Sequence, residues 1–260
     1  MILRDFANHN MSYILKDLKN SLMSEPWGAN SKILSQYINV NFEIAYTEGK
    51  IYENEEQDIA FWKVGNLVSL AGDPLWFVYK LNPRGTQTWD FKKAHFGSVL
   101  PILNSNQLID DYQIHYQTPS FYSSWQFVLE PPTVEHIMNK NKERLVSVFG
   151  AELAQNSHML FRTILGELEL QKKRSDVMNQ WYFGKYQFLM PLYLKNPDKV
   201  SLTATLEPLE DVKQYKVRTL LYPEFAYPHV RAVVKNRSAI TGWMSVDDTE
   251  LQGLDFDQNE

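Results

Sequence analysis

The region between residues 181 and 243 combines aromatic and positively charged side chains, the two types that bind flat rings and phosphates. Its aromatic residues are Trp181, Tyr182, Phe183, Tyr186, Phe188, Tyr193, Tyr215, Tyr222, Phe225, Tyr227 and Trp243, and its cations are Lys185, Lys213, Lys216, Arg218 and Arg231, with His229 beside them. On a sheet, this mixture suits a nucleotide or a single-stranded nucleic acid. The alternative is a two-sided sheet whose aromatic residues fill the core.

The run from residue 227 to residue 231, Tyr-Pro-His-Val-Arg, holds the first candidate for chemistry. His229 can exchange protons near neutral pH, and the planar fork of Arg231 suits a phosphate. Together with Tyr227 they form a candidate site in which His229 is the acid or base. In the alternative reading Arg231 is structural, pairs with a carboxylate and anchors a turn.

A second candidate group, His136, Asn141 and Arg144, lies on a predicted helix. His136 is the other candidate for acid–base chemistry, and Arg144 is a candidate ligand-binding residue. Helical spacing places Asn141 and Arg144 partly round the helix from His136, so the three need not form one site.

The strand predicted at residues 185–194 has two faces of different chemistry. Its side chains alternate, with Tyr186, Phe188 and Met190 on one face and Lys185, Gln187 and Leu189 on the other. We expect the Phe188 face to lie in the core and the opposite face to lie nearer to solvent or a ligand. Lys185, Gln187 and the neighbouring Tyr182 are therefore further candidate ligand-binding residues.

Other reactive arrangements are excluded or lack support. The chain has no cysteine, which excludes a disulfide scaffold and a thiol nucleophile. The six histidines do not occur at metal-ligand spacings. There is also no glycine-rich phosphate loop and no Gly-x-Ser-x-Gly elbow. We therefore predict no metal and no cofactor, and whether the protein is an enzyme stays open.

Composition and charge bound the class of protein. With 260 residues, 44% of them hydrophobic, the chain can bury the core of one large domain or two small ones. The net charge of −5 is uneven, because six acids fall in the last fourteen residues and leave 25 acidic against 26 basic residues elsewhere. We predict a flexible acidic tail at 247–260, or a tail that folds back over a basic groove. Without a signal-peptide pattern or a long apolar run, we expect a cytoplasmic protein.

Hydrophobic periodicity predicts the elements that position these residues. Helices are predicted at about 14–22, 31–48 (with Ser31 as cap and Gly49 as stop), 133–145 and 151–174, and strands at 50–53, 59–64, 75–81, 89–95, 185–194, 201–207, 214–222 and 231–235. A long helix followed by four strands thus occurs twice, at 27–100 and 133–243. We predict an α+β fold in which two helix-plus-antiparallel-strand halves form one compact domain of residues 1–246.

Two stretches carry a resemblance to a known family. Residues 184–194 read Gly-Lys-Tyr-Gln-Phe-Leu-Met-Pro-Leu-Tyr-Leu, and residues 226–231 read Ala-Tyr-Pro-His-Val-Arg. They resemble the Gly-x-x-Gln-Leu-Leu-Leu-Pro-Leu and Ala-Tyr-x-x-Ala-Arg segments of a bacterial domain of unknown function, number 3825 in that series. The resemblance covers roughly residues 27–243, but residues 61–67 depart from the family's Phe-Asn-Thr-Gly-Leu. The family's association with RNA-binding and nuclease domains implies RNA or nucleotides as ligands.

These observations favour a nucleotide- or single-stranded-RNA-binding domain of RNA metabolism or defence, without demonstrated catalysis. One alternative is a metal-independent RNA-processing enzyme with a histidine–arginine site. Another is a protein-interaction module that acts as an inhibitor or a sensor. RNA binding predicts salt-dependent affinity, whereas a protein partner predicts an exposed apolar patch. A membrane is not an expected partner.

Overall fold

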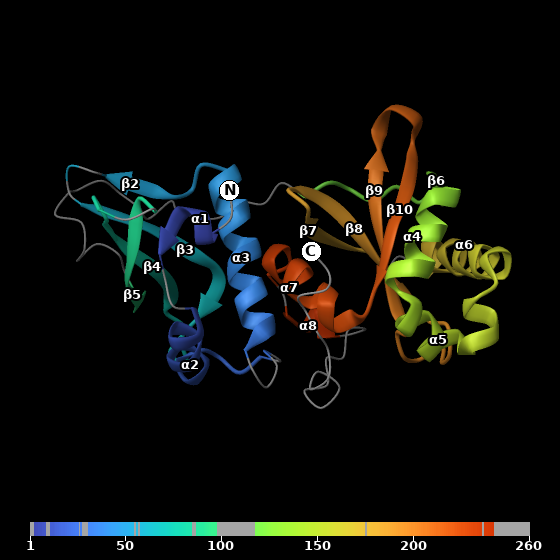
Figure 1. The fold of residues 1–260 in the computed structure, drawn as a ribbon, viewed down its shortest axis with the longest axis horizontal. Coiled ribbons are helices and arrows are strands. Elements are labelled where there is room, and N and C mark those ends of the chain that lie inside the picture. Colours follow the sequence, from blue (N-terminus) through green and yellow to red (C-terminus); the bar gives the residue numbers. More distant parts are fainter. Residues whose placement is uncertain are drawn as a thin grey trace. The chain divides into compact units, whose positions relative to one another are not determined.

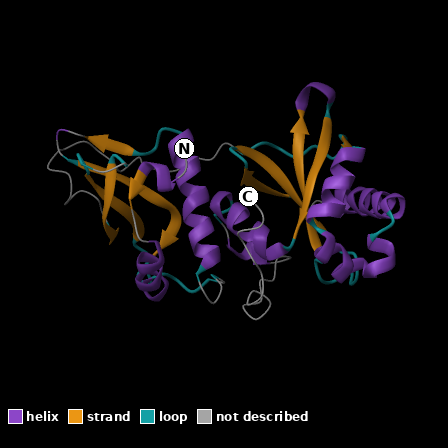
Figure 2. Cartoon of the chain, in the orientation of Figure 1, coloured by secondary structure: helices purple, strands orange, loops and turns teal. Residues whose placement is uncertain are grey.

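The computed structural model describes residues 3–8, 11–25, 27, 31–54, 56, 58–84, 87–97, 118–174, 176–235 and 237–241. Its contacts divide the chain into two compact units, residues 1–116 with 247–260, and residues 117–246. Each unit carries a sheet and helices (Figures 1 and 2), so the α+β class is confirmed. The single domain at 1–246 stays a prediction. The predicted tail at 247–260 and Trp243 lie outside the described residues.

The first unit contains a sheet in the order β1-β5-β4-β3-β2. Its helices are α1 (Leu3–Phe6), α2 (Met11–Ser21) and α3 (Lys32–Thr47), and its strands are β1 (Ala7–Asn8), β2 (Tyr52–Asn54), β3 (Ile59–Val68), β4 (Pro74–Leu81) and β5 (Trp89–Phe96). All neighbouring strands are antiparallel except β1 and β5, which are parallel. The helix and strands predicted between residues 31 and 95 are thus present.

Helix α3 packs closely on β3. Gly65 in β3 has a φ of 54°, and a methyl group there would collide with the side chains of Asn41 and Tyr37. The hydroxyl of Tyr37 accepts a hydrogen bond of 2.9 Å from the backbone N–H of Asn66. Ser31 is not the predicted side-chain cap, because its backbone is left-handed and its side chain makes no capping bond. Gly49 follows the helix with a φ of 65°, as a stop residue should.

The second unit contains a sheet in the order β6-β10-β9-β8-β7. Its strands are β6 (Gln126–Val128), β7 (Met178–Tyr182), β8 (Lys185–Leu192), β9 (Leu202–Leu209) and β10 (Gln214–Leu221), and its helices are α4 (Pro131–Lys140), α5 (Lys142–Ala154), α6 (Ser157–Arg174), α7 (Pro223–Val233) and α8 (Arg237–Thr241). A 3₁₀ turn, η3 (Glu210–Val212), joins β9 to β10. Neighbouring strands are antiparallel except β6 and β10.

One face of this sheet packs against α4, α5 and α6 (Figure 1), and we call it the packed face. Its buried strand residues are Phe188, Met190, Leu192, Leu202, Ala204, Leu206, Tyr215, Val217 and Leu220. Phe188 is 1% exposed, which confirms that its side of β8 lies in the core. The hydrophobic side chains of the helices and the alternate residues of the strands therefore form one core.

A β-bulge interrupts β10 between Val217 and Thr219. Val217 pairs with Leu206 and Thr219 with Thr205, so Arg218 is the extra residue on β10. A bulge resets the alternation of side chains. Val217 and Leu220 can therefore both face the core although they are three residues apart.

Two predicted elements of the second half are wrong, and one strand was missed. The helix predicted at 133–145 is in fact two helices, α4 and α5, which meet at Asn141. The strand predicted at 231–235 is wrong, because residues 223–233 form helix α7. This also removes the predicted turn at Arg231. The sheet instead gains β7, a strand that was not predicted. Helix α7 lies against β7, on the side of the sheet away from α4–α6 (Figure 1).

Candidate functional site

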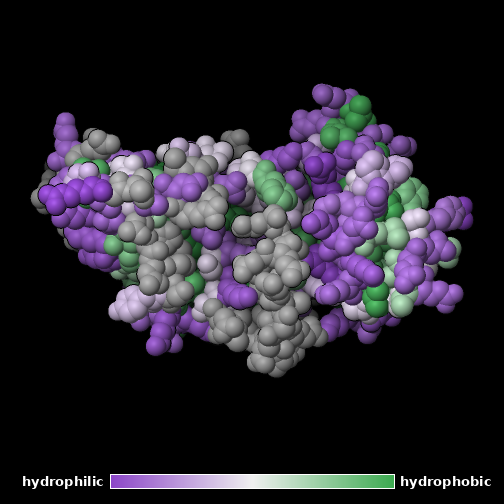
Figure 3. Space-filling view, viewed as in Figure 1, coloured by the Kyte–Doolittle hydropathy of each residue, from purple (hydrophilic) through white to green (hydrophobic). Residues whose placement is uncertain are grey.

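The face of the second sheet opposite the packed face carries mostly polar side chains, and we call it the polar face. Its polar residues are Gln180, Tyr182, Lys185, Gln187, Thr203, Thr205, Glu207, Lys216, Arg218 and Thr219. They alternate along β7–β10 with the buried residues of the packed face. The space-filling view shows hydrophilic residues along the β9–β10 hairpin and a hydrophobic patch at its tip (Figure 3).

The strand register brings these residues together in rows across the sheet. Gln180 of β7 pairs with Gln187 of β8, and Glu207 of β9 pairs with Lys216 of β10. Extending the β8–β9 register by one residue beyond the Phe188–Leu206 pair places Gln187 opposite Glu207. The row therefore reads glutamine, glutamine, glutamate, lysine from β7 to β10.

Two neighbouring rows flank this one. On one side Tyr182 pairs with Lys185, next to the hairpin turn that joins β7 to β8. On the other side Thr205 pairs with Thr219. The Thr205 hydroxyl accepts a hydrogen bond of 3.1 Å from the Thr219 N–H and lies 3.4 Å from the Thr219 carbonyl oxygen, to which it donates. This side chain therefore fixes the backbone at the bulge.

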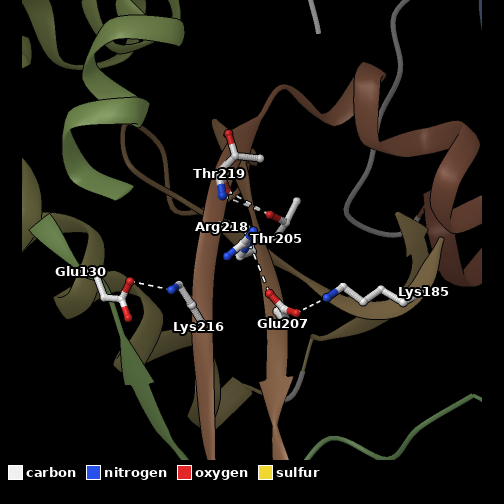
Figure 4. A network of polar contacts seen from close by, with 7 residues as sticks. All are labelled: Glu130, Lys185, Thr205, Glu207, Lys216, Arg218 and Thr219. Atoms are coloured by element: carbon white, nitrogen blue, oxygen red, sulfur yellow. Dashed lines mark hydrogen bonds and ion pairs between the residues drawn. The ribbon is translucent and has the colours of Figure 1, made fainter. Parts of the chain in front are cut away.

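A charged network crosses the polar face (Figure 4). The Glu207 carboxylate pairs with the ammonium of Lys185 through one oxygen and with Nε of Arg218, at 3.3 Å, through the other. Lys216 pairs with Glu130 at 2.5 Å. The side chains of Lys185 and Arg218 are 52% and 49% exposed, whereas that of Glu207 is 15% exposed. Three cations thus meet two carboxylates, and two of those cations are open to solvent.

The two glutamines of the central row are buried, with 0% exposure for Gln180 and 2% for Gln187. Nε2 and Oε1 of Gln180 and Oε1 of Gln187 have no hydrogen-bond partner among the described residues. A buried polar group without a partner costs about 1–3 kcal/mol. We expected the Gln187 face of β8 to lie nearer to solvent or a ligand. Gln187 is not open to solvent, but its Oε1 has no hydrogen-bond partner among the described residues.

His229 lies on α7 beside the Tyr182 end of the polar face. Its Nδ1 is 2.8 Å from the carbonyl oxygen of Trp181, so Nδ1 carries the proton and donates it. Its ring meets that of Tyr182 edge-to-face, with 5.1 Å between the centroids. Burial lowers the pKa of His229 to about 4, although the hydrogen bond to Trp181 opposes this shift. At neutral pH the imidazole is therefore uncharged, and Nε2 is the nitrogen with a lone pair.

Arg144 lies near the same end of the unit and is mainly engaged in structural contacts. Its Nη1 donates to the Asn141 side-chain oxygen at 2.5 Å and to the Leu220 carbonyl at 2.9 Å. The guanidinium carbon lies 5.3 Å and 4.9 Å from the ring centroids of Tyr222 and Phe225. Burial lowers the pKa of Arg144. Arg144 therefore links the end of β10 to the beginning of α7.

Burial also raises the pKa of Tyr182, and the positive charge of Arg144 acts against that rise. The contacts of Arg144 described above are to Asn141, Leu220, Tyr222 and Phe225. The structure thus brings together four predicted residues, Tyr182, Lys185, Gln187 and His229.

The other predicted site residues are placed differently. Tyr227 is fully buried and Arg231 is 5% exposed, both within α7. On a helix, residues two apart point about 200° from one another, so His229 and Arg231 lie on different sides of α7. On a strand they would have shared a face. His136 is exposed on α4, whereas Asn141 and Arg144 are buried and bonded to each other, so the three do not form one site.

Sequence reasoning missed Gln180, Glu207 and Thr205. Gln180 was missed because β7 was not predicted. The signal for β7 was the Phe183-Gly184 pair, whose φ values of 48° and 75° are those of a two-residue hairpin turn. Phenylalanine replaces the usual Asn or Asp at its first position. Glu207 and Thr205 lie in a strand that was predicted, but nothing in its pattern distinguished their face.

Among the described residues, no group of three histidine or acidic side chains is close enough to hold a metal ion. None of the helices in those ranges is both long and apolar enough to cross a membrane.

Comparison with known proteins identifies the family of the chain. Residues 18–239 match the family described as Domain of unknown function (DUF3825), so the chain belongs to it. No curated protein and no solved structure matches the chain. The family match covers most of the described residues of both units, including all of the polar face.

Proposed function

We propose that the second unit binds a nucleotide or a single-stranded RNA on its polar face. The protein would act in the cytoplasm, in RNA metabolism or in defence. The observation that supports this is the central row, in which buried amides with unused hydrogen-bonding atoms adjoin a cluster of exposed cations. Amide side chains suit the hydrogen-bonding edge of a base, and cations suit phosphates.

Tyr182 adds a ring at the edge of this row. A phenol ring next to Lys185 and His229 offers a surface on which a base can stack. Ring, amides and cations then correspond to the base face, the base edge and the phosphate of one ligand. A protein partner, by contrast, would favour an apolar patch over this arrangement.

The test is binding of fluorescein-labelled RNA hexamers, followed by fluorescence anisotropy over a series of salt concentrations. The protein should bind with an affinity that falls as salt rises, and with a slope of about −0.7 for each phosphate contacted. Unlabelled mononucleotides in competition distinguish a nucleotide from a longer strand as the preferred ligand.

A double variant, Lys185→Ala with Arg218→Ala, should weaken binding and reduce the salt slope. The control is Lys173→Ala, which removes one exposed lysine from α6, a helix on the other side of the sheet. If no hexamer or nucleotide binds, and none raises the melting temperature, the polar face is not an RNA site. The protein-interaction alternative then takes precedence.

One observation favours catalysis as a second candidate function. The hydrogen bond to Trp181 fixes the tautomer of His229 and leaves the Nε2 lone pair available as a base. In a metal-independent reaction, Nε2 would take the proton of a ribose 2′-hydroxyl. That oxygen would attack the adjacent phosphorus and displace the 5′-oxygen, which would take a proton from water. The exposed His136 has no comparable support.

The enzyme reading predicts that RNA is cleaved in the presence of EDTA and that cleavage is lost in His229→Gln. If the wild type binds hexamers but leaves them intact over long incubation, the protein is a binding domain alone.

A further inference from the structure

Glu207 occupies a central position among the cations of the polar face (Figure 4). Each of its two carboxylate oxygens is held by a different cation, one from β8 and one from β10. The carboxylate is less exposed than either Lys185 or Arg218. The acid therefore lies between and beneath two side chains whose outer parts are open to solvent.

This geometry is the one in which proteins bind a phosphate. Two oxygens of an anion, one on an ammonium and one on a guanidinium, form charge-assisted hydrogen bonds. The bulge supplies one of the two cations, because Arg218 is the extra residue of β10, and Thr205 fixes the backbone of the next residue, Thr219. In the free protein the guanidinium itself is held by Glu207.

The contacts that Glu207 makes are also easy to exchange. Ion pairs with exposed partners are worth only about 0–1 kcal/mol each, because water and salt screen them. A phosphodiester that takes over both cations loses little by displacing the carboxylate. The third cation, Lys216, is opposite Glu207 in the register, but it pairs with Glu130 and is not part of this exchange.

We propose that Lys185 and Arg218 form a phosphate subsite of the polar face, which Glu207 occupies in the free protein and an RNA phosphodiester takes over on binding. This inference rests on the proposed function. It adds that Glu207 is an internal competitor, so that the native chain binds RNA less tightly than its cations alone would allow.

The test compares Glu207→Gln with a charge-matched control, Glu169→Gln. Both changes remove one negative charge from an ion pair, because Glu169 pairs with Lys172 on α6 at 2.8 Å. Only Glu207 lies on the polar face. Affinity for a labelled uridine hexamer is measured by anisotropy, and inorganic phosphate serves as the competitor.

Glu207→Gln should bind the hexamer about three- to tenfold more tightly than the wild type, the gain that release of two exposed ion pairs implies. Phosphate should compete at lower concentration than in the wild type. Glu169→Gln should stay within about twofold of the wild type. Adding Lys185→Ala and Arg218→Ala to Glu207→Gln should abolish the gain. Melting temperatures establish that each variant is folded.

The outcomes separate the two proposals. If the wild type binds the hexamer and Glu207→Gln binds no more tightly, the subsite is wrong and the polar face stands as the RNA site. If Glu169→Gln gains as much as Glu207→Gln, the effect is one of net charge and the subsite is again wrong. If neither the wild type nor Glu207→Gln binds, both proposals fail.

Discussion

The packed and polar faces of the second sheet are built from alternate residues of the same strands but differ in the side chains that they carry. On the packed face, the ring centroids of Phe121, Phe188 and Tyr215 lie within 5.5 Å of one another. The only polar atom of these three side chains, the Tyr215 hydroxyl oxygen, accepts a hydrogen bond of 2.6 Å from the Tyr122 N–H. On the polar face, buried amides keep unused polar atoms. On the packed side, Asn179 pairs with Phe188, and its Oδ1 also has no partner among the described residues, so the two faces differ in degree.

This difference makes the polar face the more informative of the two about function. Apolar burial stabilises a fold by about 25 cal/mol for each Å² removed from water, whatever the protein does. A buried amide without a partner opposes folding. Under the proposed function a ligand supplies the missing hydrogen bonds, and mutations on the two faces should therefore have opposite effects.

The largest effect is expected on the packed face. Phe188→Ala should lower the free energy of unfolding by about 3–5 kcal/mol, because it removes a large side chain from a filled core. Urea denaturation measures the change. Phe183→Ala, at a position that is 70% exposed in the adjoining hairpin turn, is the control and should stay within about 0.5 kcal/mol. Equal losses in both variants would mean that the packed face is not the core.

The second effect depends on pH and concerns His229, beside the polar face. The pKa of His229 is about 4 in the folded protein, below the ordinary value of 6.5. The unfolded chain therefore binds the proton more readily. The contribution of the neutral ring to stability is complete above pH 6.5 and is lost as pH falls from 6.5 towards 4, by up to about 1.4 kcal/mol for each pH unit.

Stability measured against pH for the wild type and for His229→Gln tests this expectation. The variant should lose less stability than the wild type between pH 6.5 and pH 4.5, since the carboxylates titrate in both proteins. Parallel curves would show that His229 is not held neutral by the fold.

The third prediction concerns the polar face, where the loss of a buried amide should raise the free energy of unfolding. Gln187→Leu should raise the free energy of unfolding by about 1–2 kcal/mol, because it replaces a buried amide with an unsatisfied oxygen by an apolar side chain of similar size. The same variant should bind RNA less tightly. Thr203→Val is the contrast, since its hydroxyl donates to the Leu221 carbonyl at 3.1 Å and its removal should lower stability by about 1 kcal/mol. Destabilisation by Gln187→Leu would contradict the comparison between the faces.

The smallest effect on stability is expected among the exposed cations. Arg218→Lys keeps the charge but loses the planar fork, so stability should change by less than about 0.5 kcal/mol while RNA affinity falls. Lys185→Arg, which retains a cation and gains a fork, is the control and should not weaken binding. Thermal melts and anisotropy on the same samples separate the two properties.

Much of the fold could be predicted because several elements have one dominant periodicity. The helix α3 follows directly from the spacing of its apolar residues, and the strand β8 from its short apolar run at 188–192, which is buried on both faces. Helix α7 was missed because the residues at its end include Val230, Val233 and Val234, and β-branched residues favour strands. Its start did carry a signal, since Pro223 at the first helical position and Glu224 behind it favour a helix.

The candidate site was predicted only in part, for a geometric reason. Tyr182, Lys185 and Gln187 lie within one hairpin, so local alternation was enough to group them. Glu207 and Lys216 join them only through the pairing of β9 and β10, which depends on register. His229 and Arg231 were grouped because a strand was expected where a helix is found. Long-range pairing and the type of element were therefore what the sequence left open.

The bulge in β10 has a consequence for how such a site can arise. Because Arg218 is an inserted residue, its loss would leave Val217 and Leu220 on the packed face and Thr219 on the polar face. A single-codon insertion or deletion at this point would add or remove a cation without reversing the rest of the strand. Related chains can thus differ in this charge by length alone, while the core that supports it stays the same.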